Sequence, residues 1–241
     1  MTTAATDCSA EARPGLRERQ RRARESAILD AAFALIADVG YEAMTMDALA
    51  VRARLSKPTL YNHFPSKEAI AVRALVRLSE DATATALAID PTLPPIVRLE
   101  AFVRWLVGVR FQASSAAFLQ ARAALTPARA HPDYVHAAQA KLGAVAGLIR
   151  AAQDASEIDR AAAPEVLAQT LFALVCHTEY DDLIAAGQAR PDDVAQAVTR
   201  LFLDGLRATG GMPVDGTHAQ RGRRACPSFG QDSAAEEGGR L

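Results

Sequence analysis

Residues 45–68 read TMDALAVRARLSKPTLYNHFPSKE, and this stretch decides the fold. Thr45 and Ser56 each precede a short helix-compatible run, so each predicts the N-cap of a helix of about eight residues. Pro65 ends the second run, because the residue before a proline is driven out of the helical conformation. Two short helices joined by a tight turn form a helix-turn-helix, whose second helix lies in the DNA major groove.

The second of these helices carries polar side chains suited to nucleic acid. Lys57 supplies charge, and Thr59 and Asn62 can hydrogen-bond base edges or phosphate oxygens. Tyr61 and His63 can reach the phosphate backbone. Taken singly, these two rings could merely cover the apolar side of the helix, but their spacing and order favour DNA binding.

The other helices are inferred from apolar periodicity and from their caps. A helix from about Arg22 to Val39 places its apolar residues on one face, and Gly40 ends it. A helix capped by Ser66 continues to about Ala88. Prolines between residues 90 and 95 make the clearest break in the chain. The predicted helices cover residues 22–39, 46–53, 56–64, 66–88, 96–113, 115–125, 132–155, 164–187 and 191–208.

These motifs resemble one known family. The stretches 31–33, 40–50 and 55–68 are similar to the DNA-binding domain of the TetR (tetracycline-repressor) family of transcriptional regulators. The run Thr-Leu-Tyr-x-His-Phe-x-Ser-Lys-Glu is a specific signature of that domain. The resemblance implies that phosphates are clamped by Thr45, Tyr61, His63 and Lys67. It also places in the groove Ser56, Lys57, Pro58, Thr59 and Asn62.

Two positions depart from the family pattern. The family usually has glycine in the turn where this chain has Arg54, which we include at the DNA-facing surface. Arg54 is therefore expected at positive φ, which is uncommon for a residue other than glycine, unless the turn itself differs. Pro58 often corresponds to glycine, and its ring stiffens the start of the helix and removes a backbone donor. Because of both departures, the contacts that the family makes with DNA bases cannot be assigned unchanged to this chain.

The composition predicts an all-α fold. Aromatic residues make up only 5% of the chain, alanine is abundant, and alternating runs of β-branched residues are missing. We expect an N-terminal three-helix helix-turn-helix DNA-binding domain and a larger helical regulatory and dimerisation domain. The expected divisions are a disordered basic arm at 1–20, the DNA-binding domain with its connecting helix at 21–88, the ligand-sensing and dimerisation domain at 89–209, and a disordered tail at 210–241.

The resemblance implies a homodimer whose interface is built from the last two helices. The sequence agrees, because helix 191–208 has an apolar stripe and the segment 166–176 is almost wholly apolar. A helix that is apolar most of the way round is buried on several sides, so a partner helix is expected. The residues assigned to this interface are Val166, Leu174, Val194, Val198, Leu201, Phe202 and Gly205.

The resemblance also implies a small-molecule pocket among the central helices. Aromatic and polar residues within apolar helices are the candidates, because ligand pockets are mostly apolar with a few polar groups. The same residues could be ordinary core, and His177 could be a hydrogen-bonded interior histidine. The candidates are Trp105, Phe111, Phe118, Arg122, Tyr134, His177 and Tyr180.

Charge is distributed unevenly. The net charge of −1 does not by itself indicate a nucleic-acid partner. Residues 11–24, however, contain six arginines against two glutamates, a local charge of +4. These arginines either contact phosphate or reflect a GC-rich codon habit, since the chain has only three lysines among its 27 basic residues.

The remaining features exclude several classes of protein. Cys8, Cys176 and Cys226 are odd in number and widely spaced, so neither a disulfide framework nor a zinc site is expected. We expect no metal and no cofactor. The first residues lack the apolar core of a signal peptide, and no run of about 18 apolar residues could span a membrane. The expected location is the cytoplasm.

Three functions stay open on the sequence. The leading one is a repressor that binds double-stranded operator DNA as a homodimer and is released by a small-molecule effector. The second is a DNA-binding dimer that senses no small molecule. The third is a small all-α enzyme with Cys176 or His177 as its reactive group, although no base and orienting partner can be recognised at a suitable spacing.

Overall fold

The computed structural model of the chain describes residues 15–112, 118, 121 and 124–207. Within that part the regular secondary structure is helical, apart from an isolated bridge between Ile158 and Arg207. The all-α fold is therefore confirmed. None of the described helices is long and apolar enough to cross a membrane.

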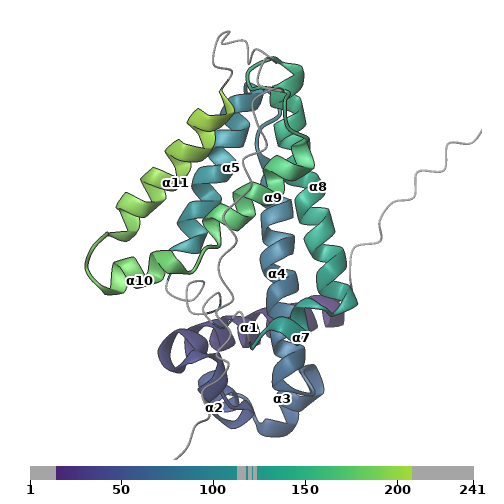
Figure 1. The fold of residues 1–241 in the computed structure, drawn as a ribbon. Coiled ribbons are helices and arrows are strands. Elements are labelled where there is room, and N and C mark those ends of the chain that lie inside the picture. The colour runs from purple at the N-terminus through teal and green to yellow at the C-terminus, as the bar shows by residue number, and fades with distance from the viewer. Residues whose placement is uncertain (1–14, 113–117, 119–120, 122–123, 208–241) are drawn as a thin grey trace, which may run out of the picture. The chain divides into compact units, whose positions relative to one another are not determined.

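The first four helices form the helix-turn-helix region (Figure 1). They are α1 (Leu16–Ala43), α2 (Met46–Arg52), α3 (Lys57–His63) and α4 (Lys67–Ala88). Gly40 has φ 80° and interrupts α1, in agreement with its expected role as a helix stop. The predicted start of the first helix was wrong, because α1 begins six residues earlier than Arg22.

The early start of α1 has a local cause. Arg22 pairs with Glu18, and Arg21 pairs with Glu25, both one helical turn apart. Such pairs stabilise an exposed helix by a few tenths of a kcal/mol each. Residues 16–20 of the expected arm are thus helical, whereas residues 1–14 lie outside the described part of the chain.

The remaining helices form the body. They are α5 (Pro95–Arg110), α7 (Thr126–Arg129), α8 (Pro132–Asp154), α9 (Pro164–Val175), α10 (Glu179–Ala185) and α11 (Pro191–Leu206). Proline stands at the start of α5, α8, α9 and α11, where its missing N–H costs no hydrogen bond.

Three predictions for the later part of the chain need correction or lie outside the described residues. The single helix predicted at 164–187 is divided into α9 and α10, with a break at residues 176–178. The short helix α7 was not predicted. Most of the helix predicted at 115–125, and the tail predicted at 210–241, fall outside the described residues.

Two hydrophobic cores hold these helices together, and α4 belongs to both. Its first half buries Ile70 and Ala74 in the helix-turn-helix core, and its second half buries Ala82 and Ala86 in the body core. Helix α4 also lies side by side with α8 (Figure 1). Helix α4 thus connects the body core to the helix-turn-helix core as one continuous helix. The predicted domain division at residues 88 and 89 stays a prediction.

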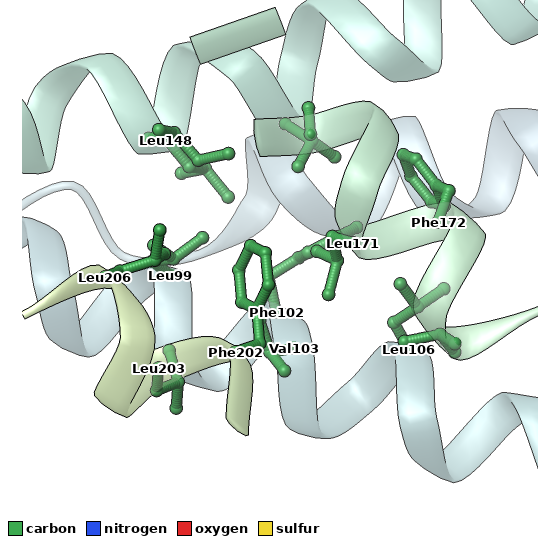
Figure 2. Close-up of a cluster of buried hydrophobic side chains, with 14 of the residues drawn as sticks. Leu99, Phe102, Val103, Leu106, Leu148, Leu171, Phe172, Phe202, Leu203 and Leu206 are labelled. Carbon is green, nitrogen blue, oxygen red and sulfur yellow. The ribbon is translucent and has the colours of Figure 1, made fainter. Parts of the chain in front are cut away.

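The body core is built mainly from α5, α8, α9 and α11. Figure 2 shows Phe102 of α5, Leu171 of α9 and Phe202 of α11 close together. Phe102 and Leu171 are fully buried, and Phe202 is 6% exposed. Burial of large apolar side chains at about 1.5–3 kcal/mol each is the main force that holds this part of the fold together.

Candidate nucleic-acid interface

The backbone of the helix-turn-helix is fixed by two side-chain caps and a left-handed turn. The Thr45 hydroxyl accepts a hydrogen bond from the N–H of Ala48 at 3.1 Å, and the Ser56 hydroxyl accepts one from the N–H of Thr59 at 3.3 Å. Arg54 between the helices has φ 56°. The predicted caps and the positive φ of Arg54 are both confirmed.

Helix α3 divides cleanly into a buried and an exposed side. Leu60 is fully buried and Phe64 is 5% exposed, both in the core shared with α1 and α4. Tyr61 and Asn62 are exposed on the opposite side, as are Lys57 and Pro58 at the start of the helix. The exposed side carries a cation, a phenol and an amide, which are groups that bind phosphates and base edges.

Several of the predicted DNA-binding residues already make contacts within the chain. Lys57 Nζ lies 2.7 Å from an Asp47 carboxylate oxygen, and both side chains are about 60% exposed. An ion pair so exposed contributes at most about 1 kcal/mol, so a phosphate can replace the aspartate. The hydroxyls of Ser56 and Thr59 lie 2.7 Å apart and also contact one another.

His63 and Lys67 are less available than the sequence suggested, because His63 is largely buried and Lys67 is hydrogen-bonded within the chain. The His63 side chain is only 12% exposed, and its Nδ1 lies 3.8 Å from a Glu25 carboxylate oxygen of α1. Lys67 donates to the backbone carbonyl of Glu42 at 3.0 Å, and its Nζ lies 4.3 Å from the centre of the Tyr41 ring. Burial, followed by the charges of Glu68 and Glu42, raises the pKa of Tyr41 above its usual value. Through its contacts with Glu42 and Tyr41, Lys67 joins the start of α4 to the end of α1.

The predicted pocket residues are not gathered in one place. Phe118 packs against Phe33 of α1, with ring centroids 5.3 Å apart, so it belongs to the helix-turn-helix core. Trp105 packs on Phe102 at the edge of the body core, 5.7 Å between centroids. Tyr134 is half-buried near the start of α8. Arg122 lies outside the described residues.

The structure instead gathers three of the candidates around a residue that the sequence did not single out. Arg110, at the end of α5, lies over the ring of Phe111 and donates to the backbone carbonyl of His177. The ring of His177 in turn packs against Tyr180, 5.7 Å between centroids. An arginine at the end of an apolar helix was the available signal, but nothing local showed that Arg110 is buried.

The predicted dimer residues differ in how much surface they offer. Val194, Val198 and Phe202 are buried within the single chain, which leaves them little surface for a partner. Val166 and Leu201 are 58% and 69% exposed. Leu174 is half-buried and Gly205 is exposed. The assignment of this interface stays a prediction. Of the predicted residues, Val166 and Leu201 offer the most apolar surface to a partner.

Two open grooves lie elsewhere. One of about 480 Å³ runs between the first part of α1 and the turn at Ala53–Leu55. The other, of about 730 Å³, lies between α4 and α8 and is lined partly by Arg73, His131 and His136. None of the predicted pocket residues lines either groove. Among the described residues, no group of three or more histidine, cysteine or acidic side chains is placed to hold a metal ion.

Comparison with known sequences assigns the first part of the chain. Residues 28–74 match the family model of bacterial regulatory proteins of the tetR family. The HTH-type transcriptional repressors KstR of Rhodococcus jostii (strain RHA1) and Mycobacterium tuberculosis are each 48% identical over 60 residues. These matches cover 25% of this chain and 27% and 26% of the relatives. The chain thus matches only about a quarter of the length of these relatives.

Comparison with solved structures extends over most of the chain. The fatty acid degradation regulator FadR of Bacillus halodurans has a TM-score of 0.63 and 18% identity, over 81% of this chain and 98% of that one. FadR of Bacillus subtilis, solved in complex with stearoyl-CoA, has a TM-score of 0.60 and 17% identity, over 76% and 99%. At such low identity the likeness shows that the fold is shared.

Proposed function

The chain belongs to the TetR family of bacterial regulatory proteins, and we propose from this premise that it is a repressor that binds operator DNA. The observation that carries the proposal is the exposed side of α3, where Lys57, Tyr61 and Asn62 project from a helix held by Leu60 and Phe64. In a helix-turn-helix this second helix reads the major groove. The site of action would be the chromosome in the cytoplasm.

We further propose that a small-molecule effector releases the DNA. Two observations support this. The structural neighbour FadR of Bacillus subtilis was solved with stearoyl-CoA, and α4 connects the body core of this chain to the helix-turn-helix core. An effector that favours one arrangement of the body would change operator affinity through α4, typically by about 1–3 kcal/mol of coupling free energy.

The two other functions differ in their support. The family consists of regulators and not of enzymes, and this removes the basis for a reactive Cys176 or His177. A DNA-binding dimer without an effector keeps the same DNA-binding surface. It is distinguished by a mobility-shift assay with selected DNA, in which a broad panel of metabolites leaves the complex unchanged.

The DNA-binding function is tested by selecting sites from random DNA and measuring binding by fluorescence anisotropy. We expect Tyr61→Phe to weaken binding to all sequences about equally, because a phosphate contact carries no sequence information. Asn62→Ala should instead change the preferred bases. Tyr134→Phe, the same change on α8, is the matched control. Failure to select any site, or unchanged binding by both α3 variants, would contradict the proposal.

A further inference from the structure

Two cations of the body contact the C-terminal end of α9. The Arg110 side chain is 1% exposed and donates from Nε to the Val175 carbonyl at 3.1 Å and from Nη2 to the His177 carbonyl at 3.0 Å. Lys141 of α8 lies with its Nζ 4.3 Å from the centre of the Phe172 ring. Phe172 and Val175 both belong to the last turn of α9, so Lys141 and Arg110 each contact this turn.

Each of these two cations lacks a partner: Arg110 lacks one hydrogen-bond acceptor, and Lys141 lacks an opposite carboxylate among the described residues. Arg110 Nη2 lies 2.8 Å from an Asp181 carboxylate oxygen, but its buried Nη1 has no hydrogen-bond partner in the described part of the chain. Lys141 forms no ion pair with any carboxylate of the described residues. Burial and, to a smaller degree, Arg129 lower the pKa of Lys141, while Cys176 opposes the shift. Within the described residues, Lys141 is therefore a half-buried ammonium group without an opposite carboxylate.

A purely structural role accounts for only part of this arrangement. Cations at the C-terminus of a helix interact favourably with its carbonyl groups, which explains the two hydrogen bonds that Arg110 donates to backbone carbonyls. The same argument does not explain Lys141, because burying a charge without a partner costs free energy. The contact with the Phe172 ring returns about 0.5–2 kcal/mol at most. Uncompensated groups of this kind concentrate at ligand sites.

We propose that Lys141 and the unpartnered Nη1 of Arg110 bind the anionic group of an otherwise apolar small molecule. The ligand is an organic anion, such as a carboxylate or sulfonate. The apolar part of the ligand would lie among the half-buried rings near this end of α5 and α9, which include Trp105 and Phe111. This inference rests on the proposed function, because it names the chemical class of the effector.

The position of Lys141 connects the site to DNA binding. It projects from α8, which packs along α4, and α4 continues into the helix-turn-helix core. An anion that neutralises Lys141 changes how α8 and α9 pack, and α4 receives that change directly. The ligand therefore acts on α8, the helix of the body that packs along α4.

The test uses two fluorescent probes with the same aromatic body. 8-Anilinonaphthalene-1-sulfonate carries one negative charge, and N-phenyl-1-naphthylamine is neutral. Wild-type full-length protein should bind the sulfonate at a saturable site, and Lys141→Met should weaken that binding about tenfold or more, as expected for losing one charged contact. Lys141→Arg should retain most of the affinity, and neither variant should change binding of the neutral probe. Arg150→Met, an exposed change on the same helix, is the matched control.

Three results would overturn the inference: no saturable sulfonate site in the wild-type protein, equal sulfonate binding by wild type and Lys141→Met, or equal losses for both probes. Circular dichroism checks that each variant is folded. Operator binding is measured on the same proteins. If no variant binds DNA in the absence of probe, the proposed function fails. If DNA binds but the sulfonate releases wild type and Lys141→Met equally, only the assignment of the anion site fails.

Discussion

Arg54 holds a backbone conformation that side chains other than glycine avoid. Its φ of 56° lies in the left-handed region, at the turn between α2 and α3. In this region the crowding of Cβ costs about 1–2 kcal/mol, and glycine avoids that cost. Glycine also makes the unfolded chain more flexible, and this loss of entropy on folding offsets part of the gain. We expect Arg54→Gly to raise the free energy of unfolding by about 0.5–1 kcal/mol, measured by urea denaturation.

The control for this prediction is Arg54→Ala, which removes the charge and keeps Cβ. It should bring no gain in stability. If the alanine variant is stabilised as much as the glycine variant, loss of the guanidinium and not relief of the backbone is the cause.

Glu68 makes the stability of the first turn of α4 dependent on pH. Its carboxylate accepts hydrogen bonds from its own backbone N–H and from the Ser66 hydroxyl, and these hold its pKa below the usual 4.5. A lowered pKa in the folded state adds stability above the unfolded value, and that stability is lost as pH falls through the folded value. Glu68→Gln should therefore be less stable than wild type at pH 7, and the difference should shrink below pH 4.5.

Unfolding in urea across a pH series measures this difference directly. A gap between Glu68→Gln and wild type that stays constant from pH 7 down into the acid range would show that the carboxylate charge contributes nothing.

At the scale of the element, a buried ion pair joins α10 to α5. None of the residues of α10 is fully buried, and Arg110 reaches it from α5 through Asp181. Removing one partner of a buried pair costs about 3–5 kcal/mol, because the other charge is left without compensation. We expect Asp181→Ala to lose that much in stability, while Asp182→Ala, an exposed neighbour, should change it little.

A double-mutant cycle separates the pair from the rest of the helix. Arg110→Met combined with Asp181→Ala should be less destabilised than the sum of the two single changes, because no buried charge remains. Strict additivity of the two free-energy changes, measured by denaturant unfolding, would show that Arg110 and Asp181 do not stabilise one another.

The elements also show what a sequence can and cannot predict. Helices α2 and α3 were predicted within a residue or two, because their boundaries depend on Thr45, Ser56 and Pro65, which act on their immediate neighbours. The break between α9 and α10 was missed, because it is held by Arg110, more than sixty residues earlier in the chain. Lys141 was missed for the same reason, since its burial depends on α9 and not on α8 alone.

At the scale of the whole molecule, the proposed binding to a palindromic operator would require two copies of the chain. A two-fold dimer places its two helix-turn-helix units on half-sites about one helical turn of DNA apart, or a multiple of it. The single chain leaves Val166 of α9 and Leu201 of α11 mostly exposed on two helices that contact one another. Paired across a two-fold axis, these side chains would bury an apolar surface that α9 and α11 cannot cover by themselves.

We therefore expect Leu201→Arg to shift the protein toward monomer and to weaken operator binding, because each charge placed in an apolar interface must be desolvated. Leu87→Arg on α4, at a side chain that is also about 70% exposed, should leave the dimer intact. Phe202→Ala should act differently: this ring is buried within its own chain, so the variant should lose about 3–5 kcal/mol of stability without a new charge at the interface. Sedimentation velocity at micromolar concentration, with anisotropy on a selected palindrome, measures both effects. A folded Leu201→Arg dimer that binds the palindrome like wild type would place the interface on another face of the molecule.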